Sequence, residues 1–487
     1  MQPAGRGQAG RPAQPGRAIQ PGPIQRGRIQ PARRIAFEVI SAVGASDAYA
    51  NLLLPVKLER ARLGAQDAAL ATELTYGTLR MQGYYDAVIE LAAGRATDRI
   101  DPAILDVLRL GAHQLLSMRT AQHAAVDESV SLARDVGSRS ASGFANAVLR
   151  TITRSDPADW HERVMSGVAS DDHRLSLEYS HPVWIVRAFR RALAAEGREI
   201  ELADLLAADN VAPQVTLVAL PGLTDRSELR GARPARYSPF AAVSEGGDPA
   251  RSTPVLAGRA RVQDEGSQLA ALALTRATTV AGAPPPQSGE RWLDLCAGPG
   301  GKTALLAAEA LAVGATLVAN EVVPARAGLV RNALAVFDDP PRVLEQDGRL
   351  VGRAMARQFD RILVDAPCTG LGALRRRPEA RWRKQPRDVA ELATLQAELL
   401  ESAIDALAPG GIVAYVTCSP HLGETVAITR AAIARHPDSL VALDTAGVLA
   451  EVTDAPLDTA GEGSHVQLWP HRTGTDAMFI SLLQKRT

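Results

Sequence analysis

The pattern of apolar and polar residues divides the chain into three zones. From residue 32 to about residue 152, apolar residues recur at three- and four-residue spacing, as in RRIAFEVISAV and DPAILDVLRLGAHQLLSM. This spacing predicts several short helices, one of which begins where Asp101 precedes Pro102. From residue 261 onward, short apolar runs alternate with longer helical ones, which is typical of a doubly wound, mainly parallel sheet. Between these zones, helical runs and a strand-like QVTLVAL predict a small α+β subdomain.

The last zone supplies the elements of the predicted sheet. The expected strands are 291–296, 315–320, 342–347, 361–366 and 411–418, and the helices between them are 302–312, 324–337 and 388–407. A final pair of runs, SHVQLWP and AMFISLL, is expected to close the sheet with antiparallel strands. The expected fold is therefore multidomain, with an all-α N-terminal domain, a small α+β linker subdomain and a C-terminal α/β Rossmann-like domain.

Length and composition fit this organisation. The chain has 487 residues, of which 46% are apolar, and no apolar run approaches the roughly 20 residues that cross a bilayer. The first residues have no apolar core, so we expect no secretory signal and a cytoplasmic protein. The 54 basic residues balance the 54 acidic ones, so a basic surface for nucleic acid must be local. Five arginines and no acids in residues 1–31 predict a disordered basic tail. The expected boundaries are 1–31, 32–155, 156–260 and 261–487.

Residues 291–303, RWLDLCAGPGGKT, form the first candidate site. An apolar strand, a loop of small residues and a helical run follow one another, so backbone N–H groups and the positive helix end can approach a ligand. The lack of a Cβ atom at Gly298, Gly300 and Gly301 permits this approach. A P-loop would need glycine at Cys296, and a dinucleotide fingerprint would need it at Thr303. The stretch therefore predicts a cofactor loop of another class.

The three cysteines, Cys296, Cys368 and Cys418, each lie at the end of a predicted strand. So few thiols exclude a disulfide scaffold, and the absence of a CxxC pair predicts no metal site. A free cysteine is usually a buried small apolar residue, and we keep that interpretation for Cys296 alone.

Polar residues follow the other predicted strands at the edge where a ligand binds in such sheets. Glu321, about twenty residues beyond the glycine loop, is suited to the ribose hydroxyls, and Asp347 to an adenine amine. The strings DAPC and TC then place Asp365, Cys368 and Cys418 at the same edge. Each residue alone is more often a helix cap or a core residue, but together they outline an adenosine site beside two thiols.

These strings resemble a known family. RWLDLCAGPGGKT is similar to the DxCAxPGGKT motif of the RNA cytosine-5 methyltransferases, and VDAPCTGLG and TCSPH are similar to their motifs IV and VI. The strings ELTYGTLR, LRLGAHQLL, AAVDESVSLAR and GFANAVLR resemble the NusB RNA-binding family. Together they resemble the 16S ribosomal RNA methyltransferases of the RsmB (Sun, Fmu) type over residues 32–485.

The resemblance implies a reaction and its residues. It implies S-adenosylmethionine (SAM) as cofactor, an RNA substrate, Cys418 as the nucleophile that adds to cytosine C6, and Cys368 in product release. Asp365 would stabilise the cytosine ring. The same reaction on tRNA, or a non-catalytic RNA-binding antitermination factor, stay open as alternatives. The residues implied for SAM are Cys296, Ala297, Gly298, Pro299, Gly300, Gly301, Lys302, Glu321, Asp347 and Asp365.

Other residues are weaker candidates. Lys302 and His421 could lower the pKa of Cys418, because a free thiol titrates near pH 8.5. TCSPH departs from the longer TCSVxxxEN string of many relatives, so the correspondence of Glu424 stays open. Basic and aromatic residues suited to RNA, although each is as commonly a solvated surface residue, are Arg80, His113, Arg150, Arg375, Arg376, Arg377, Arg381, Trp382 and Arg383.

Overall fold

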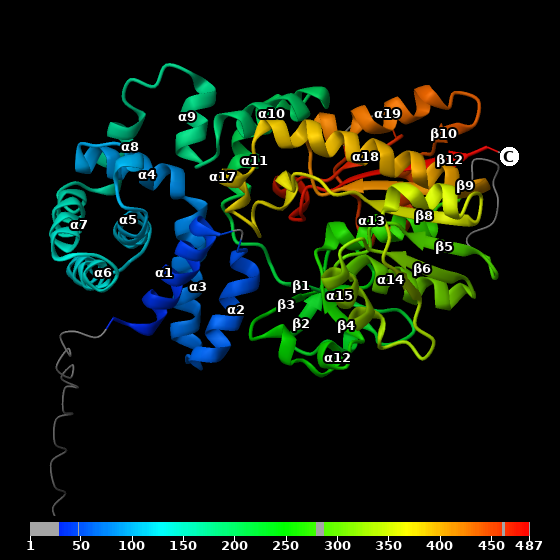
Figure 1. The fold of residues 1–487 in the computed structure, drawn as a ribbon, viewed down its shortest axis with the longest axis horizontal. Coiled ribbons are helices and arrows are strands. Elements are labelled where there is room, and N and C mark those ends of the chain that lie inside the picture. Colours follow the sequence, from blue (N-terminus) through cyan, green and yellow to red (C-terminus); the bar gives the residue numbers. More distant parts are fainter. Residues whose placement is uncertain (1–28, 47, 279–286, 460–462, 487) are drawn as a thin grey trace, which may run out of the picture.

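The computed structural model describes residues 29–46, 48–278, 287–459 and 463–486. The predicted disorder of the N-terminal tail falls almost wholly on residues 1–28, outside this part of the chain. A helical domain lies at one end of the molecule and a large α/β domain at the other, with the middle of the chain above and below their junction (Figure 1). None of the helices in the described part is long and apolar enough to cross a membrane.

Eight helices build the N-terminal domain around one apolar core. Asp101 caps one of them, because its carboxylate accepts hydrogen bonds from the N–H groups of Ala103 and Ile104, and Pro102 takes the first helical position. The predicted start of this helix is therefore confirmed. The helices are α1 (Pro31–Ala45), α2 (Ala50–Ala61), α3 (Ala65–Arg80), α4 (Gln82–Ala93), α5 (Pro102–Leu116), α6 (Gln122–Val136), α7 (Arg139–Ile152) and α8 (Pro157–Met165).

The middle of the chain contributes two separate parts. Helices α9 (Asp171–Glu178), α10 (Val183–Ala195) and α11 (Leu202–Ala208) share an apolar cluster with Leu371, Leu374 and Trp469 of the α/β domain. A four-stranded antiparallel sheet of order β2-β3-β1-β4 follows, below the main sheet in Figure 1. Its strands are β1 (Thr216–Ala219), β2 (Ala232–Pro234), β3 (Ala241–Ser244) and β4 (Ala260–Val262), with the short α12 (Thr253–Leu256) before β4. The boundary expected between residues 260 and 261 falls inside β4.

The main sheet has eight strands, with seven in the order β10-β12-β9-β8-β5-β6-β7 and β11 paired to β12. The five strands from β9 to β7 are parallel, and β12 joins β9 antiparallel, as expected for the closing pair. The three-residue β10 was not predicted. The strands are β5 (Arg291–Asp294), β6 (Thr316–Asn320), β7 (Arg342–Leu344), β8 (Phe359–Asp365), β9 (Leu407–Thr417), β10 (Leu440–Ala442), β11 (Val466–Gln467) and β12 (Phe479–Lys485).

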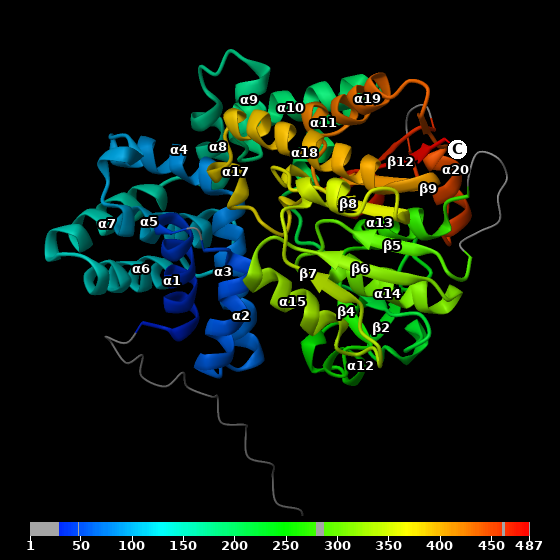
Figure 2. The same ribbon diagram turned by 45° about the vertical axis from the view of Figure 1, so that its right-hand side comes forward.

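Helices cover both faces of this sheet, because alternate side chains of a strand point to opposite sides. In β9, Ile412, Ala414 and Val416 belong to one apolar cluster, and Val413 and Tyr415 belong to the other. The first face carries α13 (Glu265–Arg276), α14 (Gly301–Val313), α15 (Pro324–Leu334) and α20 (Thr445–Val452). The second carries α16 (Val351–Ala354), α18 (Pro386–Ala406) and α19 (Val426–Arg435), and Figure 2 shows α18 and α19 above the sheet. Two short helices, α17 (Ala380–Arg383) and α21 (Pro470–Thr473), lie in connections.

Candidate active site

The glycine loop after β5 is held by the end of β6. The Gly298 N–H donates to Glu321 Oε2 over 3.1 Å, and Arg326 Nη2 donates to the Gly298 carbonyl over 2.7 Å. A Cβ atom on Gly298 would lie 2.2 Å from Glu321 Oε2, so any other residue there would displace the Glu321 carboxylate. Gly300 has a φ of 106°, in the region that side chains disfavour. The predicted tight loop is therefore present, and it is fixed by Glu321.

This loop ends at an uncapped helix. No side chain caps the N-terminus of α14 at Gly300, which leaves the first N–H groups of the helix available to an anionic ligand. Two acceptors that the sequence did not reveal lie beside the loop. Asp294 Oδ1 and Gln263 Oε1 are both buried without a hydrogen-bond partner, and the Gln263 amide lies close to Gly301. Burial raises the pKa of Asp294 to about 7, although the Thr303 hydroxyl donates to its Oδ2.

Glu321 and Asp347, predicted to face an adenosine, differ in their surroundings. Glu321 is 3% exposed, and its Oε1 accepts a hydrogen bond from the Val323 N–H. Asp347 follows β7, the strand next along the sheet, but its carboxylate caps the turn Gly348–Leu350 and pairs with the Arg349 guanidinium at 2.6 Å. The Arg349 hydrogen bonds lower the pKa of Asp347. An adenine amine would therefore compete with Arg349 for this carboxylate.

The two thiols that follow β8 and β9 meet. Cys368 Sγ and Cys418 Sγ are 3.4 Å apart. The hydrogen bond from the Cys368 thiol lowers the pKa of Cys418, against the effects of burial and of Asp365, and Lys302 adds to the lowering. The same hydrogen bond, together with burial, raises the pKa of Cys368 well above its usual value. Cys418 is therefore the thiol that more readily becomes a thiolate.

A lysine and a carboxylate border the thiol pair. Lys302 Nζ, from the first turn of α14, lies 2.8 Å from Asp365 Oδ2 at the end of β8. Burial alone would lower the pKa of Lys302, but Asp365 outweighs it and the pKa is raised, so the ammonium charge is retained. His421, the other residue expected to activate Cys418, instead accepts a hydrogen bond from the Gly423 N–H at its Nδ1 and caps a turn.

Comparison with known proteins gives two family matches and close relatives. Residues 283–484 match the model of the 16S rRNA methyltransferase RsmB/F family, and residues 30–154 match the NusB family. A Mycobacterium tuberculosis protein named as a candidate methyltransferase is 50% identical, over 94% of this chain and 97% of the relative. The ribosomal RNA small subunit methyltransferase B of Salmonella typhi is 31% identical, over 83% of this chain and 89% of the relative. The chain belongs to the RsmB/F family of 16S rRNA methyltransferases.

A solved structure shares the fold of this chain. The crystal structure of PH0851 matches with a TM-score of 0.76 and 23% identity, over 94% of this chain and 99% of that one. As an RsmB/F-family protein, the chain is a SAM-dependent rRNA methyltransferase with a NusB-like helical domain. Among the described side chains, no group of three or more His, Cys, Asp or Glu is arranged to hold a metal ion.

The basic segment 375–383, which was expected to contact RNA, makes contacts within this RsmB/F-family protein instead. Arg381 is fully buried and donates to the carbonyls of Arg80 in the NusB-like domain and Asp209 near α11, over 2.9 and 2.8 Å. Arg383 donates to the carbonyls of Val43, Ser46 and Ala48 at the end of α1. The prediction of RNA contacts was therefore wrong for Arg381 and Arg383, because they join the two domains.

Their neighbours are also held by protein groups. Arg376 pairs with Asp264 at 2.6 Å and with Asp476 at 3.0 Å, Arg375 donates to the Gly474 carbonyl, and Arg377 lies over the ring of Tyr49. Trp382 packs its ring edge against Gly83 and keeps 37% of its surface exposed, so its stacking on a base stays a prediction.

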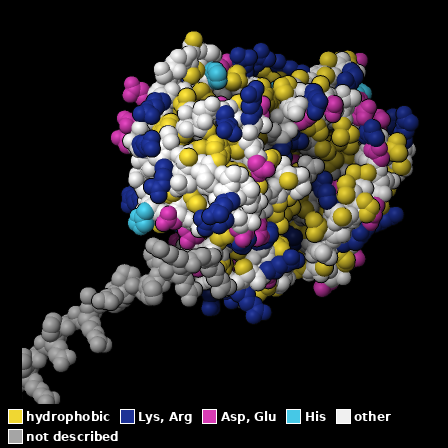
Figure 3. Space-filling model, turned by 60° about the vertical axis from the view of Figure 1, so that its left-hand side comes forward, with side chains coloured by type: hydrophobic (Ala, Val, Ile, Leu, Met, Phe, Trp, Pro, Cys, Tyr) yellow, Lys and Arg dark blue, Asp and Glu magenta, His cyan; other side chains and the backbone are white. Residues whose placement is uncertain are grey.

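Of the three candidates in the NusB-like domain, two are buried. Arg80 donates to the Arg375 carbonyl and lies over the ring of Tyr76, and His113 is hydrogen-bonded to the Tyr85 hydroxyl. Burial keeps both side chains away from the surface, so the structure supports neither candidate as an RNA contact. Arg150 is exposed on α7. Basic side chains on this end of the molecule are spread among acidic ones and form no single patch (Figure 3).

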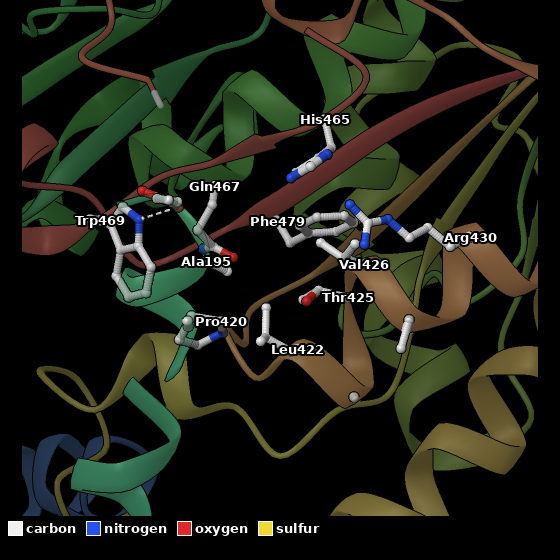
Figure 4. Close-up of a pocket in the computed structure, with 14 residues that line it drawn as sticks. Ala195, Pro420, Leu422, Thr425, Val426, Arg430, His465, Gln467, Trp469 and Phe479 are labelled. Carbon is white, nitrogen blue, oxygen red and sulfur yellow. Dashed lines mark hydrogen bonds between the residues drawn. The ribbon is translucent and has the colours of Figure 1, made fainter. Parts of the chain in front are cut away.

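A cavity of about 430 Å³ borders the chain that follows Cys418. Figure 4 shows Pro420 and Leu422 on one side of it, Trp469 and Phe479 along its wall, and Arg430 at its edge. The turn after Cys418 is therefore packed incompletely on the side of this cavity.

Proposed function

We propose that this RsmB/F-family protein transfers a methyl group from SAM to carbon 5 of a cytosine in 16S rRNA through a covalent Cys418 adduct. The observation that carries the proposal is the contact of two thiols, 3.4 Å apart, beside the Lys302–Asp365 pair. A non-catalytic RNA-binding protein has no use for this grouping of a lowered-pKa thiol, a second thiol, a carboxylate and an ammonium.

The first step uses the Cys418 thiolate. Carbon 5 of cytosine is too weak a nucleophile to take a methyl group directly. Addition of the thiolate to C6 breaks the aromatic ring and makes C5 the carbon of an enamine, which attacks the methyl group. The lowered pKa of Cys418 increases the fraction of this thiol that is present as thiolate.

Asp365 and Lys302 would hold the ring during this step. A carboxylate at Asp365 can accept hydrogen bonds from the exocyclic amine and from a protonated N3, and so stabilise the charge that develops on the ring. Lys302 keeps this carboxylate in place, because its ammonium lies 2.8 Å away. The target base must leave its stack to reach both groups.

Cys368 would promote product release. After transfer, C5 carries both its proton and the methyl group. Loss of the proton returns an electron pair to the C5–C6 bond as the C6–S bond breaks and Cys418 leaves as a thiolate. While Cys418 is bonded to carbon it carries no charge, which removes the main cause of the raised Cys368 pKa. Cys368 can then lose its own thiol proton to water, and the thiolate that results accepts the C5 proton directly or through another water.

The loop residues fit SAM, which supplies an electrophilic methyl group. The backbone of residues 296–301, the uncapped start of α14 and the unpaired acceptors of Asp294 and Gln263 suit an amino acid carboxylate and ammonium. We assign Glu321 to the ribose hydroxyls, since it lies at the end of β6 beside Gly298. Lys302 and Asp365 border the same loop, and Asp347 is the candidate for the adenine amine.

Cysteine variants test this proposal. Cys418→Ala should abolish methyl transfer from labelled SAM and form no covalent RNA adduct, whereas Cys368→Ala should accumulate an adduct that survives denaturing electrophoresis. Wild-type protein without SAM is the control. Identical, adduct-free behaviour of the two variants would contradict the separate roles of Cys418 and Cys368.

Bisulfite sequencing of rRNA and tRNA from a deletion strain tests the substrate. Loss of one 5-methylcytosine from 16S rRNA supports the proposal. Loss of 5-methylcytosine from tRNA alone would show that the protein carries out the same reaction on tRNA and not on 16S rRNA.

A further inference from the structure

Glu424 lies buried behind the two thiols and takes no part in the proposed methyl transfer itself. It is fully buried in the turn Leu422–Glu424, six residues beyond Cys418. Its Oε1 accepts hydrogen bonds from the Thr369 N–H at 2.8 Å and from Gln396 Nε2 at 3.2 Å. Its Oε2 accepts from the hydroxyls of Thr369 at 2.5 Å and Ser419 at 2.7 Å. Each carboxylate oxygen therefore has two donors.

Two of the three residues that donate to the Glu424 carboxylate directly follow the two cysteines. Thr369 comes after Cys368 and Ser419 after Cys418. One carboxylate therefore joins the segments that follow β8 and β9, at the residue next to each cysteine. The ladder between β8 and β9 ends at Asp365 and Val416, which leaves the cysteines beyond its last paired residues. Glu424 therefore continues the connection between the two chains where the sheet stops.

The position of Glu424 is itself fixed mainly by hydrogen bonds. The Tyr415 hydroxyl donates to its carbonyl at 2.7 Å, and its N–H donates to the His421 carbonyl at 2.8 Å. On the other side, Leu422 and Thr425 line the cavity of Figure 4, so close packing there does not hold the turn. Loss of the carboxylate should therefore let the two cysteine loops move apart.

We propose that Glu424 is a positioning residue that holds Cys368 against Cys418, so that the Cys368 thiol donates a hydrogen bond to the Cys418 sulfur before RNA binds. The inference rests on the proposed cytosine-5 chemistry for its purpose, because it prepares the nucleophile. Glu424 does not touch the reacting atoms and acts through Thr369 and Ser419.

The reactivity of Cys418 in the free protein reports this role. The titratable groups that act on its sulfur are Cys368, Asp365 and Lys302, together with Asp476. Removal of the Cys368 hydrogen bond should raise the Cys418 pKa, and each unit of this rise lowers the thiolate fraction about tenfold near neutral pH. Iodoacetamide alkylation of full-length protein, followed by mass spectrometry of the Cys418 peptide between about pH 6 and pH 9, measures that fraction.

Four substitutions separate the explanations. Glu424→Leu should slow alkylation of Cys418 about tenfold at pH 7 and move its pH profile upward, as Cys368→Ala should. The double variant should be no slower than Cys368→Ala alone, because both changes remove one interaction. Glu424→Gln should stay within about twofold of wild type, since its oxygen can accept from Thr369 and Gln396 while its amide donates to the two hydroxyls. The matched control is Glu309→Gln, at a buried carboxylate of α14 that accepts hydrogen bonds from Thr275 and Arg276. This substitution should leave the alkylation rate of Cys418 unchanged.

Several results would overturn the inference. An unchanged pH profile of Cys418 alkylation in folded Glu424→Leu would do so. Alkylation of Cys418 in Glu424→Gln that is as slow as in Glu424→Leu would also do so, because it would show that the charge of Glu424 matters and not its hydrogen bonds. If Glu424→Leu does not fold, Ser419→Ala removes one of the four hydrogen bonds and should still slow alkylation measurably; an unchanged rate there would refute the role. Because the assay contains no RNA, absence of cytosine methylation would defeat the proposed function and leave this result standing.

Discussion

Replacement of Arg381 by methionine should loosen the NusB-like domain from the catalytic domain. The guanidinium is fully buried, and burial lowers its pKa to about 10. Its Nη1 donates to the Arg80 carbonyl, to Asn210 Oδ1 and to the Ser180 carbonyl over 2.9, 2.8 and 3.2 Å, and its Nη2 donates to the Asp209 carbonyl over 2.8 Å. One side chain therefore joins three parts of the chain.

The expected loss follows from the four acceptors. Methionine keeps most of the apolar stem but no donor, and each stranded buried acceptor costs about 1 to 3 kcal/mol. Relief of the guanidinium's desolvation offsets several kcal/mol of that total. We therefore expect a net loss of about 4 kcal/mol in the free energy of unfolding.

Calorimetry and limited proteolysis measure the effect. A protein of several domains does not unfold in one step, so the variant should show a helical-domain transition that separates from that of the catalytic domain. The connection around residues 375–385 should also become sensitive to protease. Arg387→Met, at a side chain that is 74% exposed, is the matched control and should change stability by less than about 0.5 kcal/mol. Unchanged transitions and protease resistance in Arg381→Met would refute the idea that this arginine joins the domains.

Two further predictions concern the cofactor loop and acid stability. Gly298→Ala should weaken SAM binding at least about tenfold by calorimetric titration, because its Cβ would displace Glu321; Gly143→Ala, where a Cβ meets nothing within 4 Å, should leave binding unchanged. Burial lowers the pKa of His181 from 6.5 to about 4, so between these values the unfolded chain holds a proton there that the folded chain lacks. The stability of the protein should therefore fall by about 3 kcal/mol as the pH drops from about 6.5 to about 4. Urea unfolding should show a smaller acid-induced loss in His181→Gln than in wild type, and equal losses would contradict the argument.

The catalytic edge of the sheet could be predicted because it depends on local patterns. Parallel strands bring their carboxyl ends to one edge, so a residue that follows a strand is placed once the strand is recognised. That rule was sufficient to bring Asp365, Cys368 and Cys418 together, and the 3.4 Å contact of the thiols agrees with it. It could not reveal Gln263 or Asp294, since an unpaired buried oxygen depends on what packs around it.

The basic segment shows why the rest could not be predicted. Arg381 and Trp382 have the composition of an RNA-binding loop, and no local pattern distinguishes this from a domain contact. The decisive partner of Arg381, the carbonyl of Arg80, lies 301 residues away in the sequence. The correspondence of Glu424 stayed open for a similar reason, because its hydrogen-bond partner Thr369 lies 55 residues earlier in the sequence and only the folded sheet brings the two together.

The connection between β8 and α18 gives the enzyme a fixed span. At one end the Gly372 N–H donates a hydrogen bond to the carbonyl of Cys418. At the other end the Arg383 guanidinium donates a hydrogen bond to the carbonyl of Val43 near the end of α1. If the proposed chemistry holds, an RNA bound by the helical domain would meet the Cys418 sulfur at a set distance. The target base of the proposed reaction would then be selected by its distance from the RNA segment bound to the helical domain, as well as by the sequence around it.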